Sequence, residues 1–172
     1  MSRLEEGNLA CDFPADWNVT KYDDWGYYRN QFQSSCTGNK GMDFLGFNPG
    51  DRVLWLIELK DYRQGRRDKQ KGPLWDEIAI KARDTLAGLF AAKVEAGHQD
   101  HGFALQSLTA TKLRVVLHLE QPVSHAKLFP RAYDRADVQQ KIKQLVKPID
   151  AHPRVVELQN MAHVPWDAES IP

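Results

Sequence analysis

The sequence predicts a fold of the α/β or α+β class, in which helices flank a mixed central sheet. Two apolar segments separated by a turn, 42–47 and 52–61, are typical of strands. Two others, 73–96 and 135–146, repeat apolar residues at the spacing of amphipathic helices. Because strands and helices follow one another along the chain, we expect the helices to pack on the sheet.

Length and composition indicate a single domain over residues 1–172. No apolar run approaches the roughly 18 residues of a membrane span, and the N-terminus lacks the pattern of a signal peptide. Two cysteines, Cys11 and Cys36, are too few for a disulfide framework, so we expect a reducing cytoplasm. The 23 basic and 23 acidic side chains cancel, which argues against nucleic-acid binding through bulk charge but is compatible with a local basic patch.

The N-terminal region carries the weakest pattern. Residues 1–20 show no clear period, whereas residues 21–35 are aromatic and polar. The aromatic side chains of that second stretch fall at i, i+3 and i+7, namely Trp25, Tyr28 and Phe32. This spacing predicts a helix, although Gly26 works against it, and residues 34–41 are rich in turn formers.

The segment that follows is the clearest part of the sequence. We expect a strand over 42–47, a tight turn over 48–51 and a second strand over 52–61. Every residue of 53–59 is apolar except Glu58, which is the pattern of a central strand covered on both faces. An acid and then a lysine at the end of such a strand break the local rule, and such exceptions tend to mark functional sites.

The remaining expected elements are a basic loop over 62–72, a helix over 73–96, a loop over at least part of 97–111, a strand over 113–120, a helix over 135–146 and a last short strand over 155–158. Prolines support three of these bounds. Pro73 suits the first turn of a helix, Pro122 closes a strand, and Pro148 lies beyond a helix end.

Three side chains of the strand pair are candidates for chemistry. Glu58 and Lys60 are two apart on one strand, so they point to the same face. If a loop of two or four residues joins the strands, Asp43 falls opposite Leu56 on that face, diagonal to Glu58. An odd-length loop without a bulge would turn Asp43 away.

Two neighbouring carboxylates repel each other unless a cation lies between them. Mg²⁺ binds one or two carboxylates and keeps waters for a substrate phosphate. The amine of Lys60 could then orient a water or stabilise charge on the phosphate. The alternative is a surface salt bridge between Glu58 and Lys60 with an unrelated Asp43, which leaves the apolar run around Glu58 unexplained.

The residues G-M-D-F-L-G-F at 41–47, followed by L-I-E-L-K at 56–60, resemble the PD-(D/E)XK nuclease superfamily. Met42 stands where that signature has proline. The resemblance implies a restriction-endonuclease-like α-β-β-β-α-β core over about residues 20–160. It also implies Mg²⁺- or Mn²⁺-dependent cleavage of nucleic acid, with DNA favoured over RNA.

The resemblance further implies the roles of individual residues. Asp43 and Glu58 would bind the metal together with the Leu59 carbonyl, and Lys60 would position or activate the attacking water. Members often add an acid from the first helix, usually glutamate. The candidates here are Asp23 and Asp24.

A basic cluster follows Lys60 directly and could track a phosphate backbone. It consists of Arg63, Arg66, Arg67, Lys69 and Lys71. The alternative is a solvated loop whose charge is offset by Asp61 and Asp68. His98 and His101 have ligand-like spacing, but no partner pair follows, so a plain polar loop is the better interpretation.

Two alternatives to an active nuclease remain open. The first is a catalytically silent module with the same fold, which binds nucleic acid or protein as a subunit of a larger assembly. The small size of the chain favours such an assembly or an oligomer such as a homodimer. The second is a toxin-like effector with a separate inhibitor.

Overall fold

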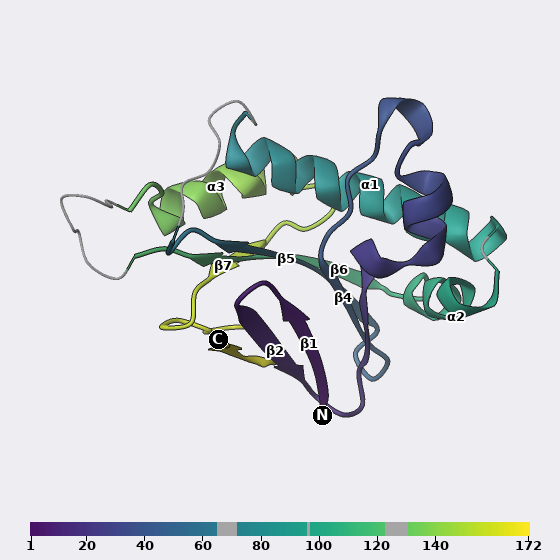
Figure 1. Cartoon of the computed structure of the whole chain (residues 1–172), viewed down its shortest axis with the longest axis horizontal. Coiled ribbons are helices and arrows are strands. Elements are labelled where there is room, and N and C mark those ends of the chain that lie inside the picture. Colours follow the sequence, from purple (N-terminus) through teal and green to yellow (C-terminus); the bar gives the residue numbers. More distant parts are fainter. Residues whose placement is uncertain (65–71, 96, 123–130) are drawn as a thin grey trace.

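The computed structural model describes residues 1–64, 72–95, 97–122 and 131–172, and within these residues the chain forms three layers (Figure 1). The middle layer is a five-stranded sheet in the order β3-β4-β5-β6-β7. Its strands are β3 (Asn18–Lys21), β4 (Phe44–Asn48), β5 (Val53–Asp61), β6 (Lys112–Glu120) and β7 (Arg154–Val156). The mixed sheet of a mixed α/β fold is thus confirmed.

Helices cover one face of this sheet and a smaller sheet covers the other (Figure 1). The helices are α1 (Leu74–Glu95), α2 (His98–Ser107) and α3 (Arg135–Val146), and α1 packs against both of the others. The smaller sheet has the order β1-β2-β8 among the described residues. Its strands are β1 (Ser2–Glu6), β2 (Leu9–Phe13) and β8 (Asp167–Ser170), so it joins the two ends of the described chain.

Strand directions follow from the connections. β4 runs antiparallel to both of its neighbours, β3 and β5, whereas β6 lies parallel to β5 and β7 parallel to β6. Parallel neighbours need a crossover, and helices supply both of them. The long crossover from β5 to β6 contains α1, which brings this helix across the face that carries Glu58.

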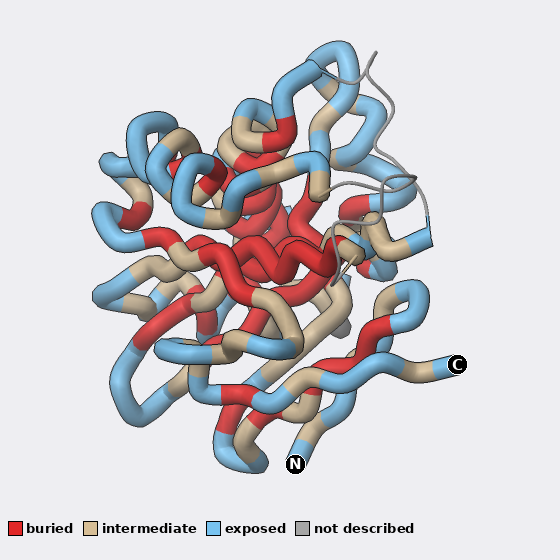
Figure 2. Tube along the Cα trace, turned by 90° about the vertical axis from the view of Figure 1, so that its left-hand side faces the viewer, coloured by how far each residue is buried: buried red, intermediate tan, exposed pale blue. Residues whose placement is uncertain are grey.

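The apolar run of β5 is explained by cover on both faces. Leu54 and Leu56 belong to the core under the helices, whereas Ile57 and Leu59 belong to the core against the smaller sheet. Figure 2 shows these buried segments at the centre of the molecule, with exposed segments around them. A charged side chain on β5 is therefore placed in the interior, and Glu58 is fully buried.

One expected helix is wrong, and one region expected to be loop in part, with loop at 97 and 108–111, is mostly helical. The helix expected over 21–35 is broken into a 3₁₀ turn, Tyr22–Asp24, and a π-helical turn, Tyr28–Phe32, because Trp25 between them has extended backbone angles. These turns lie between β3 and β4 rather than ahead of the central sheet. In addition, the region 97–111, expected to be at least partly loop, contains the ten-residue helix α2.

The strands at the chain ends were not expected. β1 and β2 lie within residues 1–20, β3 reaches from Asn18 to Lys21, and β8 follows the short strand that was expected to be the last. Each has four or five residues, and β1 has Leu4 as its one apolar side chain, so the alternation is too short to stand out. Among the helices of the described residues, none has the length and apolar character to cross a membrane.

Candidate functional site

The hairpin of β4 and β5 brings Asp43 level with Glu58. Phe44 pairs with Ile57 and Asn48 pairs with Val53, so the loop consists of residues 49–52. Leu56 faces Leu45 rather than Asp43, which means that the expected register was wrong by one pair. The loop still has four residues, so Asp43 keeps the predicted face and lies closer to Glu58 than the diagonal position would allow.

The main chain on either side of Asp43 is fixed from two directions. The N–H of Tyr22 donates to the Asp43 carbonyl at 2.9 Å, which continues the pairing of β3 with β4. From α1, the Thr85 hydroxyl accepts a hydrogen bond of 2.9 Å from the N–H of Met42, and Asp84 accepts one of 3.0 Å from the N–H of Lys40. The acid is therefore held by backbone contacts, independently of its own side chain.

Two lysines converge on the buried Glu58. The Nζ atoms of Lys60 and Lys81 each lie 2.5 Å from its Oε1, and Lys81 Nζ also lies 3.4 Å from Asp43 Oδ1. Lys60 also forms an ion pair of 3.4 Å with Glu77. Glu77 and Lys81 are four apart on α1, so they share one face of that helix. The other Asp43 oxygen, Oδ2, accepts a hydrogen bond of 2.7 Å from the N–H of Leu59.

The pKa values of Glu58 and the two lysines are shifted from their ordinary values. Burial raises the pKa of Glu58 to about 7, the charge of Asp43 adds to this, and the two lysines oppose it. Burial alone would lower the pKa of Lys60 and of Lys81, but the combined attraction of Glu58, Asp43 and, for Lys60, Glu77 outweighs burial, and both pKa values are raised. Both lysines therefore stay charged beside an acid that titrates near neutral pH.

Glu58 retains one unused oxygen. Its Oε2 is buried and has no hydrogen-bond partner among the described residues, whereas Oε1 contacts both lysines. A buried acceptor of this kind is costly unless a further ligand satisfies it. A hard cation would do so, and two carboxylates suffice for Mg²⁺. No cluster of three or more histidine, cysteine or acidic side chains suited to a metal occurs in the described part of the chain.

A cavity of about 550 Å³ opens onto this group. It is lined by Glu77 and Lys81 of α1 and by residues of the segment between β3 and β4, among them Asp43. Glu58 does not line the cavity, because it is buried behind the lysines. Ligands from the cavity therefore reach Asp43 directly and reach Glu58 only past Lys81.

Of the two accessory acids, the structure brings Asp23 to the cavity. Burial raises the pKa of Asp23 to about 6, with further contributions from Glu6 and Asp43, and its buried Oδ1 has no partner among the described residues. Asp24 lies elsewhere, on the surface, where it forms ion pairs with Arg29 and Lys21.

The expected basic cluster is not assembled at this site by the described residues. Arg63 forms an ion pair of 2.6 Å with Asp61 and donates to Ser170 of β8, on the side of the smaller sheet. The other members, Arg66, Arg67, Lys69 and Lys71, lie outside the described residues.

Sequence reasoning missed Glu77 and Lys81. Their spacing of four residues is a signal, but α1 was read for its apolar stripe alone. Only the packing of α1 on β5 reveals that this polar pair faces Glu58 and Lys60.

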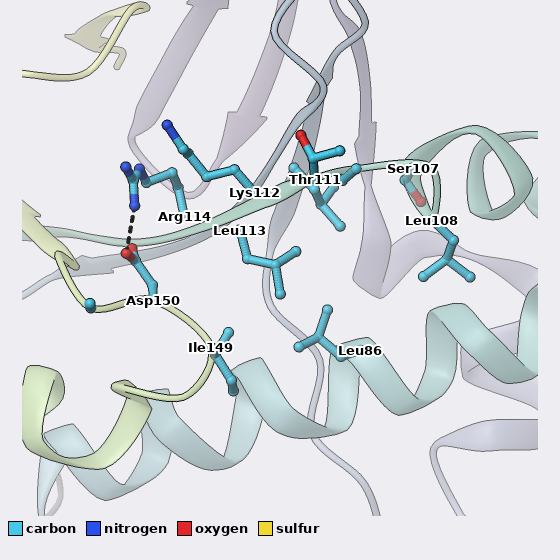
Figure 3. Close-up of a pocket in the computed structure, with 12 residues that line it drawn as sticks. Leu86, Ser107, Leu108, Thr111, Lys112, Leu113, Arg114, Ile149 and Asp150 are labelled. Atoms are coloured by element: carbon cyan, nitrogen blue, oxygen red, sulfur yellow. Dashed lines mark hydrogen bonds and ion pairs between the residues drawn. The ribbon is translucent and has the colours of Figure 1, made fainter.

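A second cavity, of about 520 Å³, lies at the other end of β5 and β6 (Figure 3). Its wall is mainly apolar, with Leu86, Leu113 and Ile149 facing inward. The buried Asp150 forms an ion pair of 2.8 Å with Arg114 at its edge. None of the candidate residues lines this cavity, so it is separate from the site at Asp43.

Comparison with known proteins gives one informative relative. A cysteine–tRNA ligase of Neisseria meningitidis (serogroup A / serotype 4A) is 30% identical over 212 aligned residues. The alignment takes in 99% of this chain but only 30% of the ligase, so the chain spans less than a third of that relative's length. No family model matches the chain, and no solved structure matches it significantly.

Proposed function

We propose that the protein is a metal-dependent nuclease that hydrolyses phosphodiester bonds in nucleic acid. The observation that carries this proposal is the meeting of Asp43, Glu58 and Lys60 beside a cavity, with one buried Glu58 oxygen left without a partner. The order β3-β4-β5-α1-β6, with β6 parallel to β5, adds support because the resemblance implies three strands, a helix and a further strand. The first helix of that order has no counterpart in residues 1–17, which form a hairpin instead.

The proposed division of labour follows from the contacts. Asp43 and Glu58 would hold Mg²⁺ or Mn²⁺, with the Leu59 carbonyl as a further ligand. The ion would supply Lewis acidity for attack of water on the phosphodiester. The ammonium of Lys60, which forms ion pairs with Glu58 and Glu77, would orient the water or stabilise phosphate charge. Asp23 would face the substrate as an accessory acid.

DNA is the proposed substrate on family resemblance, and tRNA is the competing one. The relative's name denotes an enzyme that acts on tRNA, and its likeness extends over nearly all of this chain. The proposed location is the reducing cytoplasm, because both cysteines, the buried Cys11 and the exposed Cys36, are free thiols. A homodimer or a larger protein assembly belongs to the same proposal.

The test is cleavage of plasmid, single-stranded DNA and tRNA in Mg²⁺ or Mn²⁺ by the wild type and two variants, Glu58→Gln and Lys60→Ala. We expect at least a hundredfold loss of cleavage in each variant, because Glu58→Gln weakens the proposed metal site and Lys60→Ala removes the ammonium proposed to orient the water or stabilise phosphate charge. Glu95→Gln, an exposed substitution at the end of α1, is the matched control. Equal cleavage by wild type and variants, or dependence on no divalent metal, would refute the proposal.

A second candidate function is a catalytically silent binding module. The ammonium of Lys81 already bridges Asp43 and Glu58 and Lys60 also contacts Glu58, so lysines can offset the charge of the two acids without a metal. The chain also corresponds to a minor part of a longer relative, as an appended module would. Tight binding of tRNA or DNA without cleavage in any divalent metal would favour this function.

A further inference from the structure

The ammonium of Lys81 lies where a shared cation would bind. It is 2.5 Å from Glu58 Oε1 and 3.4 Å from Asp43 Oδ1, and it is the one described side chain that contacts both acids. Glu58 is fully buried and Asp43 almost so. Two cations of the site, Lys60 and Lys81, therefore face three acids, because Lys60 also pairs with Glu77.

The position of Lys81 also controls access. Its side chain is 14% exposed and lines the cavity, whereas Glu58 does not line it. A divalent ion that enters from the cavity therefore meets Lys81 before Glu58. If Lys81 stayed in place, its ammonium and the divalent ion would be in contact in a poorly solvated site, and their repulsion would be strongly unfavourable. The flexible four-carbon stem of lysine allows the ammonium to swing into the cavity instead.

We propose that Lys81 is a resident counter-cation that exchanges with the divalent metal. This inference rests on the metal site of the proposed function and adds a regulatory element to it. In the metal-free protein the Lys81 ammonium bridges the two acids and offsets part of their charge. Metal binding displaces its ammonium from Glu58 Oε1 and Asp43 Oδ1, so the affinity of the site is set by competition.

Titration calorimetry with Mn²⁺ alone tests the exchange. Lys81→Met removes the competing charge and keeps much of the side-chain volume, and we expect it to bind Mn²⁺ about tenfold or more tightly than the wild type. Lys81→Arg retains the charge and is expected to bind as weakly as the wild type. Lys93→Met is the matched control, because Lys93 lies on the same helix about 18 Å further along its axis.

A second measurement on the wild type covers the case in which Lys81→Met does not fold. Nuclear magnetic resonance of lysine ammonium groups, with the Lys81 signal assigned by Lys81→Arg, is followed during titration with Mg²⁺. Exchange predicts that the Lys81 signal moves or broadens at saturation, whereas the Lys93 signal stays in place.

The outcomes separate this inference from the proposed function. The exchange would be refuted if Lys81→Met bound Mn²⁺ no more tightly than the wild type, or if the Lys81 signal did not change at saturating Mg²⁺. Neither result would contradict a metal-dependent nuclease. If neither the wild type nor Lys81→Met binds Mn²⁺, both the exchange and the metal-dependent nuclease are refuted.

Discussion

Glu58 and Asp150 are both buried acids at the edges of the helix-covered core, and their surroundings differ sharply. Asp150 accepts a hydrogen bond of 2.8 Å from Arg114 (Figure 3). It also accepts one of 2.9 Å from the N–H of Val115 and one of 2.9 Å from the N–H of His152. Glu58 contacts two lysine ammonium groups through one oxygen and leaves the other without a described partner.

This contrast separates a structural carboxylate from one that is open to a ligand. Rigid backbone donors satisfy Asp150, so its charge stabilises the chain where it stands. Lysine ammonium groups on long side chains surround Glu58 and can be displaced.

The largest expected effect is the difference in stability between isosteric variants of the two acids. Asp150→Asn should lower the free energy of unfolding by about 2–4 kcal/mol, because it breaks a buried ion pair and leaves an N–H donor unsatisfied. Glu58→Gln should preserve or raise stability at pH 7, because it removes a charge that is costly to bury. Urea unfolding of both variants measures this, and the opposite ranking would contradict the contrast.

The pH dependence of stability sharpens the same contrast. The pKa of Glu58 is raised in the fold from its ordinary 4.5 to about 7, so the protonated carboxyl favours the folded state. Its contribution is therefore present below about pH 4.5 and is lost as the pH rises through about 7. The stability of the wild type relative to Glu58→Gln should fall by roughly 3 kcal/mol across this window. A difference in free energy of unfolding between the wild type and Glu58→Gln that stays constant from pH 4 to 8 would refute the raised pKa of Glu58.

A smaller effect is expected at Gly41, which precedes the Asp43 segment. A Cβ at this position would lie 2.8 Å from a ring carbon of the fully buried Tyr22, so Gly41→Ala forces the backbone or the ring to shift. We expect a loss of about 1–3 kcal/mol in stability, together with reduced cleavage. Gly102→Ala, in helix α2 with no atom near its added Cβ, should instead be neutral or stabilising by up to about 1 kcal/mol.

Alternation along one strand explains how much of the site was predictable. The period of two placed Glu58 and Lys60 on one face, and the four-residue loop kept Asp43 on that face, although pairing starts at Asn48 rather than Phe47. Arg52 at the end of the loop has a positive φ of 53°, a local backbone feature that composition does not reveal. Lys81 could not be placed, because its contact with Glu58 depends on how α1 packs on the sheet.

The same reasoning holds for the fold. The helix over 135–146 was predicted at its observed bounds because Val138 and Ile142 repeat at helical spacing and are buried. Helix α2 was missed because its sequence, with Gly102 and few apolar residues, has no strong stripe. It packs against α1, so tertiary contacts support what local propensity does not.

The most direct test of the metal site is a crystal structure with Mn²⁺, read from the anomalous difference density. The account predicts one peak within about 2.0–2.3 Å of carboxylate oxygens of both Asp43 and Glu58, with the Lys81 ammonium moved away from them. Crystals in saturating Mn²⁺ that show no peak there, with Lys81 still bridging the two acids, would contradict it.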